Sequence, residues 1–345
     1  MIRTILFLVL LLQLALNHKA YSQNKTDSKQ QYASIGDFPL ENGKQIVDCK
    51  IGYRTFGKLN ANRTNAVIYP TSGGMTTYMM QLFGAGSEVD TIRYYLILID
   101  ALGNGASSSP SNSISQPKTL FPQFNIRDMV NTQYKMLTDK MNIHHLAVII
   151  GGSMGGLQAL QWAISYPDFM DKVVCIETTP KLSSYDLLWM NTYLESVKSD
   201  TAYHDGNYKI NPVTPLAVHL MQLLLTTPAI LNKTVSVDNF PTLLASLSKP
   251  NPFSVDCNNF IWQTNAVMMH DISSKAGGSL ENAAKTIKAN MLIIANKQDH
   301  IINQSLAIQF ADMAKAEIVI MDDDLGHLIF NQEKVVEATR KFLAQ

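Results

Sequence analysis

Several features that would assign this chain to a class of protein are scarce or missing. Only three cysteines, Cys49, Cys175 and Cys257, occur in its 345 residues, which excludes a disulfide framework. Cys175 lies in the apolar run VVCI, so we expect it to be buried as a small hydrophobic side chain. A bridge between Cys49 and Cys257 has no support from their spacing and stays open.

An excess of charge of one sign is missing as well. Lys plus Arg and Asp plus Glu number 28 each, so no overall field attracts nucleic acid or a charged membrane surface. The sequence contains no H-E-x-x-H, no phosphate-binding loop ending in G-K-[ST], and no G-x-G-x-x-G after the first strands. We therefore expect a small-molecule substrate, no metal, no bound cofactor and no nucleic-acid partner. The oligomeric state is not determined.

No apolar run reaches the ~18 residues that are needed to span a bilayer. The N-terminus nevertheless has the layout of a secretory signal peptide, with Arg3, an apolar run over residues 5–16, and the small residues Ala20 and Ser22. Segment 1–22 is predicted to be cleaved, which leaves an exported chain, periplasmic or extracellular, without a membrane span. An uncleaved membrane anchor is the alternative.

Short apolar or β-branched runs recur along the rest of the chain and predict strands. Near-continuous apolar strands suit a sheet that is covered on both faces. Helical patterns at 126–141 and Leu157–Ser165 alternate with them, which predicts an α/β fold with a doubly wound, mostly parallel sheet. The predicted strands are Ile51–Phe56, Ala66–Tyr69, Tyr94–Ile99, Leu146–Ile150, Val173–Ile176, Met291–Ala295 and Ile318–Met321.

Two segments depart from this alternation. Residues 182–285 carry helical patterns without a strand rhythm, and we expect a helical cap insertion between two parts of the core, 23–181 and 286–345. Whether this insertion covers the active site or only forms its own small core is left open. Residues 23–35 are polar and are expected to form a flexible lead-in.

The stretch GGSMGG at residues 151–156 follows the apolar run LAVII and precedes a predicted helix. It satisfies G-x-S-x-G, the pattern of a nucleophile presented at a sharp strand-to-helix turn. Glycines let such a turn close around a strained serine, and the helix N-terminus offers N–H groups to a developing oxyanion. We therefore interpret Ser153 as a nucleophile rather than an incidental serine in a structural turn.

A serine nucleophile needs a base, and the base needs an orienting carboxylate, in the chain order serine, acid, histidine. Asp299 follows the run MLIIA and His327 follows the run IVIM. Both lie beyond the carboxyl ends of late strands, where open α/β sheets place their chemistry. We predict a triad of Ser153, Asp299 and His327. Glu177, directly after the strand VVCI, is the alternative acid.

Two backbone N–H groups are expected to bind the oxyanion. One belongs to Met154, which follows the nucleophile, and the other comes from the loop PTSGG after the strand Ala66–Tyr69. Gly73 is the candidate in that loop, because a glycine lets a substrate approach the backbone closely. The adjacent Ser72 is the alternative donor.

The chain resembles the homoserine O-acetyltransferase family of α/β-hydrolases over most of its mature length. VDTIRYYLILIDALGNGASSSPSN is similar to the segment that follows the family's oxyanion loop. FPQFNIRDMVNTQYKMLTDKMNIHHLAVIIGGSMGGLQALQWAISYPD is similar to its most characteristic stretch. The resemblance implies the α/β-hydrolase fold, with Ser153 as nucleophile and Asp299 and His327 as its partners.

Three departures from the family pattern concern substrate recognition. The family's oxyanion segment H-A-L-T-G reads TSGGM here. Leu328 stands where the family carries an aspartate that is associated with the amino-acid substrate. A family arginine that would hold the homoserine carboxylate is replaced near His219.

Together these features predict an exported, esterase-like acyl hydrolase with an acyl-serine intermediate. An O-acyltransferase similar to homoserine O-acetyltransferase, with acetyl-CoA as co-substrate, is the first alternative. The second is a catalytically idle α/β-hydrolase scaffold that serves as a binding module. The acyl chain and the alcohol of the substrate are not determined by the sequence.

The leader generates a direct test. Because Ala20 and Ser22 are small enough for a signal peptidase, N-terminal sequencing of the exported protein should begin at Gln23 or within a few residues of it. An intact Met1 in the membrane fraction would instead favour the anchor.

Overall fold

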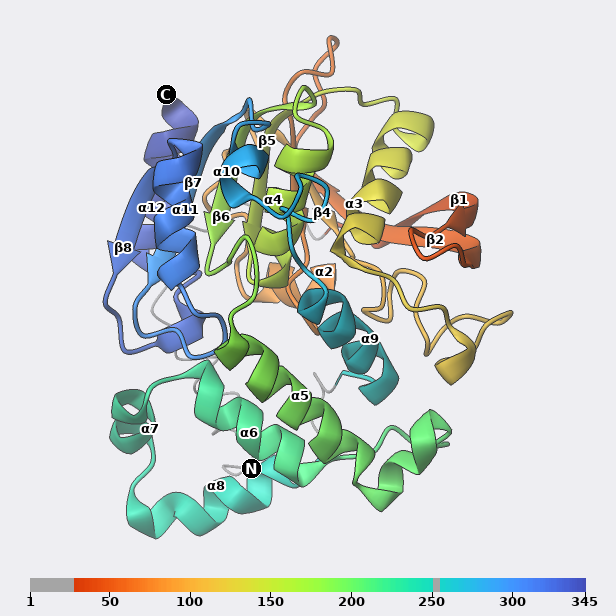
Figure 1. Ribbon diagram of the computed structural model, residues 1–345, viewed down its shortest axis with the longest axis vertical. Coiled ribbons are helices and arrows are strands. Elements are labelled where there is room, and N and C mark those ends of the chain that lie inside the picture. The colour runs from red at the N-terminus through yellow and green to blue at the C-terminus, as the bar shows by residue number, and fades with distance from the viewer. Residues whose placement is uncertain (1–27, 251–254) are drawn as a thin grey trace.

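The computed structural model describes residues 28–250 and 255–345, and the predicted signal peptide lies outside them (Figure 1). An eight-stranded sheet forms the centre, in the order β1-β2-β4-β3-β5-β6-β7-β8. The pairs β1–β2 and β2–β4 are antiparallel, whereas all pairs from β4 to β8 are parallel. The prediction of a doubly wound, mostly parallel sheet is confirmed.

All seven predicted strands are present, and β1 is an additional strand. The lead-in expected over residues 23–35 is therefore wrong from Gln31 onward. β1 was missed because it is a largely exposed edge strand whose register shifts twice, at Gly36 and Phe38, so its apolar residues do not alternate regularly. The strands are β1 Gln31–Pro39, β2 Gln45–Phe56, β3 Ala66–Pro70, β4 Tyr95–Ile99, β5 Leu146–Gly152, β6 Met170–Ile176, β7 Asn290–Asn296 and β8 Glu317–Met321.

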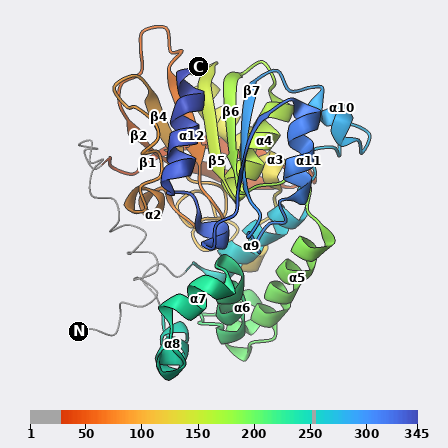
Figure 2. The ribbon, with the colours of Figure 1, turned by 90° about the vertical axis from the view of Figure 1, so that its left-hand side faces the viewer.

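Helices cover both faces of the sheet (Figure 2). The predicted helix 126–141 consists of α3 followed by a turn of π-helix, η2 (Met136–Lys140). The α-helices are α2 Thr77–Leu82, α3 Ile126–Lys135, α4 Met154–Ser165, α5 Ser184–Lys198, α6 Pro215–Leu225, α7 Pro228–Thr234, α8 Phe240–Leu247, α9 Cys257–Met268, α10 Leu280–Ala284, α11 Ser305–Ala314 and α12 Glu333–Ala344.

Successive residues of the parallel strands face opposite sides of the sheet and build two cores. In β5, Ile149 packs in the core that α3, α4 and α11 cover. Its neighbours Val148 and Ile150 pack in the core that α2 and α12 cover. The strands are apolar on both faces for this reason, and their carboxyl ends are left as the edge where polar loops emerge.

A buried polar network joins the crossover helix α3 to the helix α4. Trp162 Nε1 donates to Gln133 Oε1 at 2.8 Å, and Gln133 Nε2 donates to Gln158 Oε1 at 2.6 Å. Gln158 Nε2 in turn donates to the carbonyl of Thr71, in the loop after β3. The network therefore fixes α4 against both α3 and the loop that was predicted to supply an oxyanion donor.

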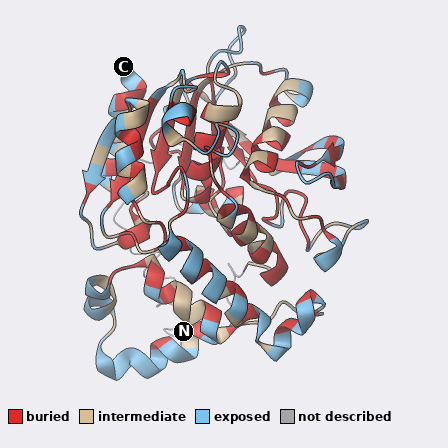
Figure 3. Cartoon of the chain, viewed as in Figure 1, coloured by how far each residue is buried: buried red, intermediate tan, exposed pale blue. Residues whose placement is uncertain are grey.

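The segment between β6 and β7 is helical in its described residues, and α5 to α8 form a lobe beside the carboxyl edge of the sheet (Figure 1). Its neck is a single antiparallel bridge between Lys181 and Asp271, which also form an ion pair. Beyond the neck, α10 packs against α11 of the core. The helical segment between Lys181 and Asp271 is therefore shorter than the predicted insertion 182–285. Figure 3 shows that α7 and α8, farthest from the sheet, are largely exposed.

All three cysteines are free and buried, so Cys49 and Cys257 do not form a bridge. Burial raises the pKa of the Cys175 thiol. Within residues 28–250 and 255–345, no single helix is long and apolar enough to cross a membrane. The helices α6 and α7 reach the required length and composition only as a pair, which is bent by 105°.

The glutamine network predicts a stability effect. Gln133→Leu removes the partner of the Trp162 indole N–H and of Gln158, and we expect it to lower the free energy of unfolding by about 2–4 kcal/mol. The exposed Gln309 on α11 provides a control. Gln309→Leu should change the free energy of unfolding by less than about 0.5 kcal/mol. Urea unfolding measures both variants, and equal effects would contradict a structural role for the network.

Candidate active site

Ser153 lies at the turn between β5 and α4, with φ 53° and ψ −126°. A residue other than glycine rarely adopts a positive φ, so the position is strained. Two glycines let the turn pack this tightly. A Cβ on Gly151 would lie 2.1 Å from the carbonyl oxygen of Gly155, and a Cβ on Gly155 would lie 2.6 Å from that of Pro70.

His327 approaches Ser153 from the loop after β8, where it lies in the 3-10 helix η5 (Gly326–Leu328). Its Nε2 is 2.9 Å from Ser153 Oγ. The imidazole is only 6% exposed, and it meets the ring of Phe330 edge to face, with centroids 5.5 Å apart. These contacts restrict the ring to one orientation.

Asp299, in the loop after β7, holds the other side of the imidazole. Its Oδ2 is 2.8 Å from His327 Nδ1 and also accepts a hydrogen bond from Gln304 Nε2. Its Oδ1 accepts from the backbone N–H groups of Ile301 and Ile302. Burial alone would raise the pKa of Asp299, but His327 and the hydrogen-bond donors outweigh burial and lower this pKa. An ionised Asp299 keeps the proton on Nδ1, so Nε2 is free to accept from Ser153.

Glu177, the alternative acid, lies beside this pair. It follows β6 with φ 48°, is fully buried, and its Oε1 accepts a hydrogen bond from the backbone N–H of Asn296 at 2.7 Å. Burial and the adjacent carboxylate of Asp299 raise the pKa of Glu177 well above its usual value. In the described structure Asp299, and not Glu177, lies at hydrogen-bond distance from His327.

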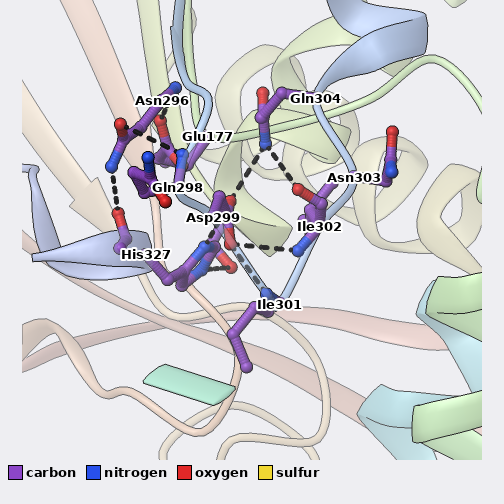
Figure 4. A network of polar contacts seen from close by, with 12 residues as sticks. Glu177, Asn296, Gln298, Asp299, Ile301, Ile302, Asn303, Gln304 and His327 are labelled. Carbon is purple, nitrogen blue, oxygen red and sulfur yellow. Dashed lines mark hydrogen bonds and ion pairs between the residues drawn. The ribbon is translucent and has the colours of Figure 1, made fainter. Parts of the chain in front are cut away.

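Asn296 is a site residue that the sequence analysis missed. Its side chain donates to the carbonyls of Asp323 and Gly326 and accepts from the N–H of Asp323. Figure 4 shows Asn296 and Glu177 beside the pair of Asp299 and His327. Asn296 thereby joins the loop after β7 to the loop that carries the histidine. Asn296 is the polar residue that directly follows the apolar run MLIIA, and this position could have identified it as a candidate.

The two predicted oxyanion donors lie next to each other. A Cβ on Gly73 would be 3.9 Å from the Cβ of Met154, and Met154 is the first residue of α4, where backbone N–H groups have no partner within the helix. The N–H of Gly74 donates to Gln263 Oε1 and the hydroxyl of Ser72 donates to the carbonyl of Gly152. The N–H of Gly74 is therefore engaged in a structural hydrogen bond. Gly73 and Met154 stay the predicted pair of donors, with the N–H of Ser72 as the alternative.

The helical lobe contacts the loops that carry Asp299 and His327. From α5, Asp186 Oδ1 accepts from the N–H of Asn303, and Trp189 Nε1 donates to the carbonyl of Ile301. From the turn between α6 and α7, Thr227 Oγ1 donates to the carbonyl of Asp324 at 2.7 Å. The lobe thus covers the carboxyl edge of the sheet and supports the loops of Asp299 and His327.

Glu177, Asp299 and His327 also have the residue types of a metal site, since their potential ligand atoms lie within 4.8 Å of one another. Both ring nitrogens of His327 already have partners at hydrogen-bond distance, Asp299 and Ser153. The arrangement in the described residues therefore fits proton transfer better than metal ligation.

Residues 69–334 match the model of the alpha/beta hydrolase fold family. The chain belongs to this family, as the sequence resemblance predicted.

Among its relatives, an ethyl acetate hydrolase of Pseudomonas veronii is 29% identical over 81% of this chain and 83% of its own. A homoserine O-acetyltransferase of Zymomonas mobilis is 29% identical over 79% of this chain and 83% of its own. The solved structure of an acetylester hydrolase from Corynebacterium glutamicum superimposes with a TM-score of 0.82 at 25% identity, covering 91% of this chain and 95% of that one. The chain is thus similar to esterases and to acyltransferases alike.

Proposed function

We propose that this protein is an exported, esterase-like acyl hydrolase that works through an acyl-serine intermediate. The observation that carries the proposal is the continuous chain of hydrogen bonds from Ser153 Oγ through His327 to Asp299. In this arrangement Ser153 is the nucleophile, His327 is the general base, and Asp299 orients the imidazole and stabilises its charged form. The similarity to an ethyl acetate hydrolase and an acetylester hydrolase supports a small ester as substrate.

The first half of the reaction transfers the acyl group to the enzyme. His327 Nε2 takes the proton of Ser153 as Oγ forms a bond to the ester carbonyl carbon. The carbonyl oxygen becomes an oxyanion, and the N–H groups of Met154 and Gly73 are the donors we assign to it. The bond to the alkoxy oxygen then breaks, and the alcohol leaves with the proton from His327.

The second half returns the enzyme to its starting state. A water molecule gives its proton to His327 Nε2 and attacks the acyl carbon. Collapse of the second tetrahedral intermediate breaks the bond to Ser153 Oγ, which regains the proton, and the carboxylic acid is released. No cofactor takes part in either half.

The choice of water over homoserine as acceptor depends on the surroundings of His327. The next residue, Leu328, is apolar and partly buried, and it stands where the resembled family carries an acidic partner. An ammonium group in such a pocket without that partner costs several kcal/mol, on the order of 2–7. An acetyl-CoA-dependent O-acyltransferase remains the second candidate, favoured by the similarity to a homoserine O-acetyltransferase.

Variants of the triad test the assignment of roles. Ser153→Ala and His327→Ala should each lower kcat for a p-nitrophenyl ester by about four to six orders of magnitude, with the fold intact by circular dichroism. Asp299→Asn should cost about 10³–10⁴-fold, because the amide favours the wrong imidazole tautomer. A fluorophosphonate probe should label the wild type and not Ser153→Ala. Absence of labelling in the wild type would support the idle scaffold instead.

A second assay tests the acceptor. Purified mature protein should hydrolyse short p-nitrophenyl esters and should not release free coenzyme A from acetyl-CoA faster in the presence of homoserine. Both rates are measured in parallel on the wild type, with Ser153→Ala as the blank. Homoserine-dependent release that saturates would overturn the hydrolase and restore the transferase.

A further inference from the structure

The backbone at Glu177 is strained in a way that directs its side chain toward the triad. Its φ of 48° is in the left-handed region, which a residue other than glycine rarely adopts. The neighbouring strand β5 ends just before Ser153, whose N–H donates to the carbonyl of Ile176, and the N–H of Glu177 donates to the carbonyl of Ile294 in β7. Glu177 is therefore fixed between the strand that carries the nucleophile and the strand that leads to Asp299.

The polar surroundings of the Glu177 carboxyl do not suit an anion. Its Oε1 accepts one backbone N–H, from Asn296, and its Oε2 is buried and accepts no hydrogen bond in the described structure. No lysine or arginine among the described residues pairs with it. Asp299, by contrast, accepts hydrogen bonds from four groups, one of them on His327. Two adjacent buried carboxyls with these environments cannot both be ionised, and Asp299 is the one that is stabilised as an anion.

We propose that Glu177 is a neutral carboxylic acid whose hydroxyl donates a hydrogen bond to the carboxylate of Asp299, and that it is a positioning residue for the triad. This inference rests on the proposed function, since it concerns how Asp299 is held for His327. With the proton on Oε2, that atom gains the partner it lacks as an anion. Asp299 gains a further donor, since Glu177 lies beside it (Figure 4) and one carboxyl oxygen of each residue lies within 4.8 Å of the other.

Two titratable groups lie beside Glu177, each with a potential ligand atom within 4.8 Å of one on Glu177: Asp299 in the loop after β7 and His327 in η5. On α5, burial, Asp186 and Asp299 raise the pKa of Tyr185. Of the two carboxyls beside the imidazole, only that of Asp299 is then charged. The acid limb of the pH profile of kcat/KM reports the ionisation of the free enzyme's base, His327. The pH of this limb is therefore set by the charge of Asp299 and not by Glu177.

Two variants separate charge from hydrogen bonding. Glu177→Gln keeps a donor for Asp299 and an acceptor for Asn296, and it should lower kcat/KM for a p-nitrophenyl ester by less than about tenfold. The similarly sized Glu177→Leu has neither group, and it should lower kcat/KM by a further factor of about 10 to 100. The acid limb of the pH profile should stay within roughly 0.3 unit of the wild-type position in Glu177→Gln, because a neutral group replaces a neutral group. If Glu177 were ionised, its removal would shift that limb down by about one unit or more.

A measurement on the folded protein does not depend on activity. Above the usual glutamate pKa of about 4.3, the unfolded chain has lost the Glu177 proton and the folded chain has kept it. The folded state then binds one more proton, so wild-type stability falls as pH rises, and this dependence is missing in Glu177→Gln. Above about pH 5.5, the unfolding constant of the wild type should rise with pH relative to that of Glu177→Gln in urea titrations, by about tenfold per pH unit as long as the folded chain keeps the Glu177 proton. A constant ratio over this range would overturn the proposal.

The outcomes distinguish this inference from the proposed function. A shifted acid limb in Glu177→Gln, with Asp299→Asn strongly impaired, would reject the neutral Glu177 and leave the triad in place. A larger loss in Glu177→Gln than in Asp299→Asn would reject Asp299 as the acid, and with it the assigned triad. We expect a strongly impaired Asp299→Asn and an unshifted acid limb in Glu177→Gln. We also expect a higher kcat/KM in Glu177→Gln than in Glu177→Leu.

Discussion

The hydrogen bond between His327 Nδ1 and Asp299 Oδ2, 2.8 Å long, is the interaction on which the rest of the site depends. It holds the imidazole so that Nε2 faces Ser153 Oγ, and it requires one ionised carboxylate in a buried position. Both side chains are buried, so charge and hydrogen bonds act there more strongly than at the surface. The surrounding donors to Asp299 are therefore as much a part of the site as the triad itself.

The helical lobe contributes to this arrangement as well as covering it. Asp186 and Trp189 of α5 bind the backbone of the loop that follows Asp299, and Thr227 binds the loop that precedes His327. Both loops leave the sheet at its carboxyl edge, where no strand pairing restrains them further. Displacement of the whole lobe would break these hydrogen bonds and loosen the two side chains together.

Much of the architecture could be predicted from local pattern. The strand runs are apolar because both faces of the sheet are covered. The strand-to-helix turn at Ser153 could be predicted because only glycines fit at positions such as Gly151 and Gly155. The edge strand β1 could not be predicted in the same way, since its register shifts hide the alternation. Asn296 was missed because its role consists of hydrogen bonds to residues far along the chain, at Asp323 and Gly326.

The sequence by itself determined seven of the strand segments, the strained turn at Ser153, and the presence of a histidine and two acids after the right strands. It favoured Asp299 over Glu177 by loop position alone and kept both as candidates, because each is a carboxyl that follows a buried strand. Only the tertiary structure decided how they differ. It brings His327 and three further hydrogen-bond donors to Asp299, whereas Glu177 receives one backbone N–H and the neighbouring negative charge. The ionisation of a buried carboxyl depends on these non-local neighbours, which no local pattern of residues encodes.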